Sequence, residues 1–278
     1  SRFFSHRSIL AAIVACIIVP SRVSGQQVEV KPTDDGVTIT VDGAPFASYL
    51  LNSGHQPVIW PIVGPDGQAM TRQYPLGEKL PTEKEDHPHH RSLWFNHGAV
   101  NGLDFWMEPD EEDDNQIEHR EFRKSESTDG VAEIVAVNDW FNNGKKVCED
   151  ERTIKFGADG NGRWIDFTVV VTASEGELVF GDTKEGTMAI IRNSNGKQDE
   201  AAWGGAAEWV DYHGTVDGKP AGIVVFDMPD SFRHPTRWHV RTYGLFAANP
   251  FGEKDFPPGD TKQGEVKLAK GEQLKLHY

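Results

Sequence analysis

Short β-like runs separated by Asp-Gly and Asn-Gly pairs recur along the chain, and this pattern restricts the fold more than any other feature. Residues 37–41 alternate between apolar and polar side chains, end at Asp42-Gly43 and lead into a second run at residues 46–51. Such pairs favour tight β-hairpins because both residues tolerate the positive φ angles of a type I′ turn. Five more pairs begin at Asp66, Asp129, Asn143, Asp159 and Asp217. We therefore expect a chain built from hairpins.

The other β-like runs have the length and spacing of strands in a sandwich. They are at residues 58–63, 131–137, 152–156, 164–172, 177–180, 188–192, 221–226 and 238–246. After the first 25 residues, no window longer than ten residues has a helical period. Short strands separated by turn signals are typical of all-β sandwiches and barrels. The sequence predicts an all-β fold, a large antiparallel β-sandwich formed by residues 26–278 as a single domain.

The first 25 residues have the parts of a secretory signal peptide. Arg2 and Arg7 form a basic start, residues 9–19 are apolar, and small residues precede Gln26. The apolar run is too short for a membrane span. We expect removal of residues 1–25 and export to the periplasm or the cell exterior. The alternative is a lipoprotein signal ending at Cys16, which the apolar residues after that cysteine disfavour.

Cysteine content and charge limit the classes of stabilising bond and of partner. Cys148 is the only cysteine left after the signal peptide, so we expect no disulfide within the chain. The chain holds 43 acidic and 28 basic residues, a net charge of −15. This charge disfavours nucleic acid and anionic lipid as partners, and no later segment suits stable membrane insertion. A small-molecule or oligosaccharide ligand is expected, and the charge suits a neutral one.

The densest group of chemically active side chains lies in residues 86–106, which hold four of the eleven histidines. Pro88 disfavours helix, and in an extended strand His87 and His89 would share one face while His90 points to the other. Two imidazoles on one face can bind a metal ion with a third ligand, His97 or Asp104.

Acid–base catalysis is the alternative use of the same residues. His89 or His90 would donate a proton, a carboxylate would act as base, and Arg91 would orient a substrate oxygen. At least two of the four histidines could instead have a structural role in a turn.

A second cluster lies in residues 233–241, where basic and aromatic side chains again surround a His-Pro pair. Trp238 and Val240 should face one way in a strand, and His239 and Arg241 the other. A polar face on an otherwise apolar strand indicates the lining of a cleft. His234 is expected to contribute to that cleft.

A third cluster, in residues 200–212, supplies carboxylates and aromatic rings. Glu208 and Asp211 fall on opposite faces of a strand, and either could be a general base. Tyr212 could hydrogen-bond a sugar hydroxyl, and Trp203 could stack on a sugar ring. The sequence does not decide which face points inward.

Four segments spread in order over residues 28–278 carry a family resemblance. They read DHPHHRSLWFNHGAVNGLDFW, GDTKEGTMAI, NSNGKQDEAAWGG followed by WVDY, and RHPTRWHVRTYGLFAANPFG. In these segments the chain resembles a family of secreted bacterial proteins labelled "methane oxygenase PmoA-like". Relative to that family, a segment is missing between Ile190 and Asn193, and the chain stops at Tyr278, where the last strand would continue. We therefore expect a shortened product, possibly truncated at its C-terminus.

The resemblance implies a β-supersandwich similar to galactose mutarotases rather than an integral membrane subunit, because no membrane span follows the signal peptide. In that fold, histidines and a carboxylate on a concave sheet face transfer protons on a sugar.

The leading hypothesis from the sequence is a secreted carbohydrate-active protein with epimerase-, lyase- or hydrolase-like acid–base chemistry and no required cofactor. The predicted catalytic residues are His89, His90, His239, Asp211 and Glu208. The predicted substrate-binding residues are Arg91, Asp104, Trp106, Trp203, Tyr212, His234, Trp238 and Arg241.

Two alternatives remain open. One is a metal-dependent oxygenase or hydrolase in which His87, His89 and His97 bind a divalent metal ion. The other is a non-catalytic glycan-binding module in which the tryptophans stack on sugar rings and the histidines are structural.

Overall fold

A computed structural model describes residues 25–81, 83–160, 162–189, 202–216, 218–241, 243–257 and 264–278. Within these ranges the chain forms β-strands and no helix, which confirms the all-β prediction. No described segment is a helix long and apolar enough to cross a membrane. Nearly all of the predicted signal peptide, and the family difference between Ile190 and Asn193, lie outside the described residues.

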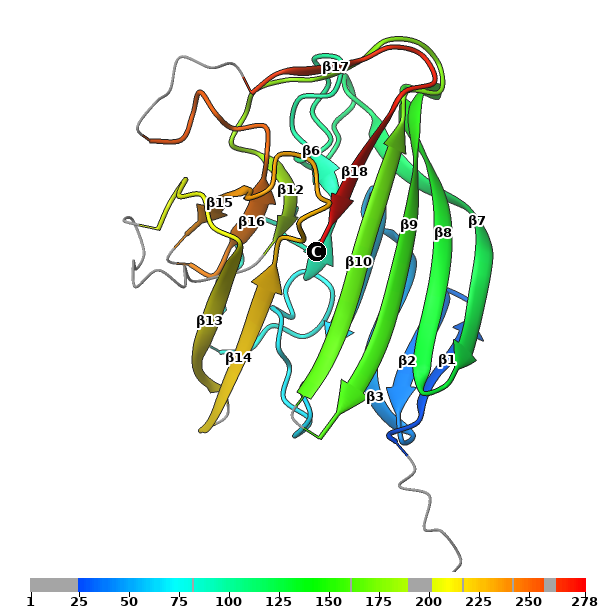
Figure 1. Ribbon diagram of the computed structural model, residues 1–278, viewed down its shortest axis with the longest axis vertical. Coiled ribbons are helices and arrows are strands. Elements are labelled where there is room, and N and C mark those ends of the chain that lie inside the picture. Colours follow the sequence, from blue (N-terminus) through cyan, green and yellow to red (C-terminus); the bar gives the residue numbers. More distant parts are fainter. Residues whose placement is uncertain are drawn as a thin grey trace, which may run out of the picture.

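Two five-stranded antiparallel sheets form the body of the molecule (Figure 1). The first, called the N-terminal sheet, has the order β1 (Val28–Thr33), β2 (Gly36–Val41), β3 (Ala44–Ser53), β4 (Gln56–Ile62) and β5 (Leu93–Trp94). The second, called the long sheet, has the order β18 (Gln273–His277), β10 (Gly162–Thr172), β9 (Lys145–Asp159), β8 (Val131–Asn142) and β7 (Asn115–Thr128). In Figure 1 the long strands are green, and the blue strands of the N-terminal sheet lie behind them.

Smaller sheets lie beside this sandwich (Figure 1). One, called the small sheet, has the order β15 (Arg237–Val240), β16 (Phe246–Asn249), β12 (Gly186–Ala189) and β6 (Asn96–His97). Strands β13 (Trp209–Val216) and β14 (Lys219–Phe226) form a hairpin, and β11 (Leu178–Phe180) pairs with β17 (Val266–Leu268). Because β6 follows β5 directly in sequence, the small sheet adjoins the end of the N-terminal sheet.

The core lies between the two large sheets and follows the two-residue period of the strands. Along β9, every second side chain from Cys148 through Asp150, Arg152 and Ile154 to Phe156 is buried, and the alternate residues are partly exposed. Phe156 meets Phe46 of the N-terminal sheet edge to face, with ring centroids 5.9 Å apart. Burying one such side chain contributes about 1.5–3 kcal/mol, so these inner faces hold the sheets together.

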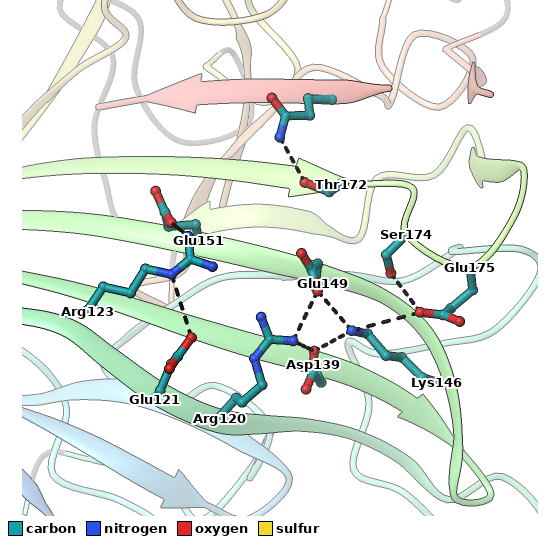
Figure 2. A network of polar contacts seen from close by, with 11 residues as sticks. Arg120, Glu121, Arg123, Asp139, Lys146, Glu149, Glu151, Thr172, Ser174 and Glu175 are labelled. Atoms are coloured by element: carbon teal, nitrogen blue, oxygen red, sulfur yellow. Dashed lines mark hydrogen bonds and ion pairs between the residues drawn. The ribbon is translucent and has the colours of Figure 1, made fainter. Parts of the chain in front are cut away.

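The outer face of the long sheet carries a network of ion pairs, drawn in Figure 2. Arg120 of β7 contacts Asp139 of β8 at 2.8 Å and Glu149 of β9 at 3.0 Å. Lys146 contacts the same two carboxylates at 2.8 Å each. These four side chains are partly exposed and share partners, so the network links β7, β8 and β9 across this face.

The predicted turn geometry is found at Asp42-Gly43, Asp129-Gly130 and Asn143-Gly144, whereas Asp66-Gly67 and Asp159-Gly160 lack two consecutive positive φ angles. Asn143 and Gly144, between β8 and β9, have φ angles of 47° and 72°, and Asp129-Gly130 has a similar pair of positive angles. Two consecutive positive φ angles define the type I′ turn that these dipeptides favour.

Gly144→Ala should lower the free energy of unfolding by about 1 kcal/mol, measured by urea denaturation. A Cβ at Gly144 would meet no atom within 4 Å, so the loss would come from the backbone angle alone. Gly160→Ala is the matched control, because that site is equally open and has no positive φ. Equal losses at the two sites would contradict the explanation.

Two strand predictions were incomplete. β7, Asn115–Thr128, was not predicted because it is an edge strand rich in charged residues, with only Asn115 and Ile117 buried. Its charges fit the edge position, since they discourage pairing with other chains. The predicted run at residues 238–246 is divided by a turn between β15 and β16, where Gly244 has a φ of 105°.

Candidate functional site

A cavity of about 920 Å³ lies between the loop that joins β4 to β5 and the end of β15. One wall comes from that loop and from the segment after β6, and the opposite wall comes from β15, the turn after it and the residue before β12. The lining residues are His87, His89, His90, Asp104, Trp106, Met107, Glu185, Trp203, His239, Val240, Arg241 and Tyr243. The first and second clusters of the sequence analysis therefore meet in one cavity.

The three histidines of the first wall lie on a tight turn, called here the histidine turn (residues 87–90). The backbone N–H of His90 donates to the carbonyl oxygen of His87 at 3.0 Å, and Pro88 occupies the second position, where its fixed φ favours a turn. The extended strand predicted here is therefore wrong. His87 has a φ of 48°, and its ring stacks on that of His90 with centroids 4.8 Å apart rather than pointing to the other face.

Arg72 binds the backbone carbonyl groups of the histidine turn. Its Nη2 donates to the carbonyl oxygens of His87 at 2.7 Å and His90 at 3.2 Å. Its Nη1 contacts Asp86 at 3.2 Å, and its Nε donates to the carbonyl oxygen of Tyr74 at 2.9 Å. One guanidinium thus ties both ends of the turn to the same loop, a role that the sequence analysis did not assign.

The ring nitrogens of His87, His89 and His90 have no hydrogen-bond partner among the described residues, unlike those of the other described histidines. One ligand nitrogen from each ring lies within 4.8 Å of the others, so the three could hold a metal ion. Described histidines elsewhere use a ring nitrogen in a hydrogen bond or ion pair; they are His55, His97, His119, His213, His234, His239 and His277.

Burial lowers the pKa of the imidazoles of His89 and His90, which favours their neutral form at neutral pH. Burial first, and then the adjacent His87, lowers the pKa of His89 to about 4. Burial, followed by His89 and His87, lowers the pKa of His90 to about 2. A neutral imidazole is the form that binds a metal ion.

His97 does not belong to this group, so its predicted role as third metal ligand is corrected. Its side chain is fully buried, its Nε2 lies 2.9 Å from the carbonyl oxygen of Gly181, and its ring packs on Phe180 and Phe251. The histidine next to His87 and His89 is His90, which the turn brings to the same side.

The opposite wall presents His239 and Arg241 as a connected pair. His239 Nδ1 lies 2.9 Å from the carbonyl oxygen of Lys184, and Arg241 Nε donates to His239 Nε2 at 2.9 Å. Both nitrogens of His239 are thus engaged, and burial lowers its pKa to about 4. These contacts suit a residue that positions Arg241 better than the proton-transfer role predicted for His239.

The carboxylates in the cavity are Asp104 and Glu185. Asp104 Oδ1 accepts from the backbone N–H groups of Trp106 at 2.7 Å and Met107 at 3.2 Å, so it also shapes the loop. Glu185 lies just before β12 and pairs with Lys184 at 2.8 Å. Glu185 was not predicted, although it lies within the segment GDTKEGTMAI.

The matching family model covers residues 36–278, and its description is a family of unknown function, DUF6807. The chain belongs to this family. No match was found among curated proteins or among solved structures. The region that matches DUF6807 contains every residue that lines the cavity.

Other predicted site residues of this DUF6807 protein lie outside the cavity. Asp211 pairs with His213 on the exposed β13–β14 hairpin, and Glu208 is exposed just before that hairpin. Neither lines the cavity, because β13 pairs with β14 and not with the small sheet. The carboxylates that line the cavity are instead those of Asp104 and Glu185.

Three further predictions are corrected by local contacts. Arg91 is turned toward Glu108, to which its Nε and Nη2 donate at 3.1 and 2.9 Å. His234 pairs with the buried Asp227 at 2.9 Å. Trp238 is fully buried in the core, because its face of β15 points into the protein.

Tyr212 lines a second, smaller cavity of about 190 Å³ beside the first. The two cavities share His90 and Tyr243, and Arg72 lines the smaller one. Tyr243 stacks on His87 with ring centroids 5.1 Å apart.

Proposed function

We propose that the large cavity is the active site of a carbohydrate-active enzyme in which His87, His89 and His90 hold a divalent transition-metal ion. The observation that carries this proposal is the set of three imidazoles that line the cavity without hydrogen-bond partners among the described residues. Three imidazoles gathered on one cavity wall, with no hydrogen bonds from the described part of the chain to fix their ring nitrogens, are arranged as metal ligands are. A shared metal ion would satisfy all three.

The rings are close enough to share one ion after they turn, because their ligand nitrogens lie within 4.8 Å of one another and ligands of one ion lie roughly 3.0–3.4 Å apart. Imidazole nitrogens about 2.1 Å from a common ion, at tetrahedral to octahedral angles, place their ring centres roughly 4.5–5.5 Å apart. The three centroid distances are 4.3, 4.8 and 5.5 Å. Such a three-histidine site leaves further coordination positions for substrate on the cavity side, which is typical of catalytic metal sites.

Several features support a carbohydrate as substrate. Trp203 and Tyr243 offer aromatic surface for stacking, and Asp104, Glu185 and Arg241 offer groups that bind hydroxyls. The resemblance to the PmoA-like family supports a supersandwich similar to galactose mutarotases, and the predicted signal peptide supports a periplasmic or extracellular role. The expected partner remains a small sugar or oligosaccharide.

Glu185 is the candidate general base. Its charge partly offsets the lowering of the pKa of both His89 and His239, so it acts on both walls of the cavity. A metal ion would polarise a substrate oxygen, and Glu185 would take the proton released or abstracted next to it. Epimerisation, elimination and hydrolysis all use this pair of functions.

The metal site is tested by isothermal titration calorimetry with Zn²⁺ and Mn²⁺, and by elemental analysis of the purified protein. We expect one equivalent of metal per chain. His90→Ala should weaken the affinity at least about 100-fold, since losing a ligand costs more than losing an outer hydrogen-bond partner.

His213→Ala is the matched control, because His213 is an exposed histidine paired with Asp211. It should bind metal like the parent protein. Sugar turnover should disappear with a chelator and return with metal. A folded protein that binds neither ion, or that turns over sugars equally well without metal, would contradict the proposal.

A further inference from the structure

Arg241 enters the cavity without a carboxylate partner. Among the described residues no acidic side chain forms an ion pair with it, whereas most other described arginines have one. Its single hydrogen bond uses Nε, which donates to His239. The two Nη groups therefore keep their N–H donors for a ligand.

The orientation of this guanidinium is set before any ligand arrives. Its central carbon lies 5.2 Å from the ring centre of Trp203, so the indole supports one face. His239 fixes the Nε side and is itself held by the carbonyl oxygen of Lys184. A planar guanidinium held in this way binds a carboxylate through two parallel hydrogen bonds, and little side-chain freedom is lost on binding.

We propose that Arg241 binds the carboxylate of an acidic sugar, such as a uronic acid, whose hydroxyl oxygens face the histidine turn across the cavity. The inference rests on the proposed function, because it names the substrate class of the same site. It assigns Arg241 to the carboxylate, Trp203 to the support of that arginine, and His239 to its positioning.

The charges around the cavity favour a carboxylate over a phosphate. Among the charged groups that line the cavity, a divalent ion on the histidine turn and Arg241 would exceed Asp104 and Glu185 by a single positive charge, which one carboxylate would neutralise. A phosphate dianion would leave an excess of negative charge. The net charge of the chain suits a neutral ligand. Charges more than about 10 Å away are largely screened at ordinary salt, so the charged groups lining the cavity set the preferred charge of the ligand.

The experiment measures binding of D-glucuronate, D-glucose and D-glucose 6-phosphate to the protein by calorimetry, with and without added Zn²⁺. We expect glucuronate to bind at least 10-fold more tightly than glucose and than glucose 6-phosphate. Arg241→Gln should abolish this preference while metal binding stays unchanged, and Arg120→Gln on the outer face of the long sheet should keep it.

Each result decides the matter. No binding of glucuronate, a preference that survives Arg241→Gln, or a preference for the phosphate would overturn the proposal. The metal titration separates this outcome from failure of the proposed function. A protein that prefers glucuronate through Arg241 but binds no metal contradicts only the metal site, and one that binds metal without the preference contradicts only the acidic-sugar inference.

Discussion

Asp150→Ala should lower the free energy of unfolding by roughly 3–5 kcal/mol, the usual cost of removing one partner of a buried ion pair. Arg152 and Asp150 both lie almost fully inside the sandwich. Arg152 donates to Asp150 through Nε at 2.9 Å and Nη2 at 3.0 Å. Asp150 also accepts from Asn138 and Trp140, each at 2.7 Å. Without the carboxylate, a buried guanidinium and two neutral donors lose their partner.

Urea denaturation of matched variants checks this expectation. Glu151 is the next residue of β9 and points to the opposite, exposed face, where it pairs with Arg123 (Figure 2). Glu151→Ala should cost less than about 1 kcal/mol, as exposed pairs do. The double variant Asp150→Leu/Arg152→Met should recover much of the loss, because it leaves no buried charge. Equal losses in the free energy of unfolding for Asp150→Ala and Glu151→Ala would show that the buried ion pair contributes no more to stability than the exposed one.

Arg72→Ala should weaken metal binding about 10–100-fold, although Arg72 would not touch the ion. Its hydrogen bonds to the carbonyl oxygens of His87 and His90 hold the two ends of the histidine turn. Without them the three rings would sample other orientations, and binding would have to restore one arrangement. The affinity is measured by calorimetry with Zn²⁺, and circular dichroism checks that the variant folds.

Arg163→Ala provides the control for this second expectation. Arg163 also donates to two backbone carbonyl oxygens, those of Pro45 and Val63, but it does not line the cavity. Its replacement should leave the metal affinity unchanged. A folded Arg72→Ala protein with the affinity of the parent would mean that the turn keeps its shape without the arginine.

Local sequence signals predicted the fold well because they act through neighbouring residues. Asn143-Gly144 specifies its own turn, and the two-residue period around Ile154 specifies a strand with one buried face. The edge strand β7 lacked that signal, because few of its side chains are buried. Turn residues do not predict the pairing of strands that are distant in the sequence, such as β10 with β18.

The candidate site shows the same limit more sharply. The density of histidines in residues 86–97 pointed to the right segment, but the alternation rule misplaced His90, because Pro88 starts a turn instead of extending a strand. Glu185 lines the cavity and Asp211 does not, because the pairing of β12 with β6 and β16 brings Glu185 there. Pairing between strands that are distant in the sequence produces no local pattern from which it could be predicted.

The origin of the two cavity walls has a mechanical consequence. All three imidazoles belong to one turn in the β4–β5 loop, so they shift as a unit, whereas Arg241 and His239 follow the small sheet. A ligand that contacts both walls would therefore link the β4–β5 loop to the small sheet. Binding would stabilise the arrangement of the loop and the small sheet that the ligand requires. The distance between a bound ion and the Arg241 guanidinium would also limit the length of the substrates that contact both.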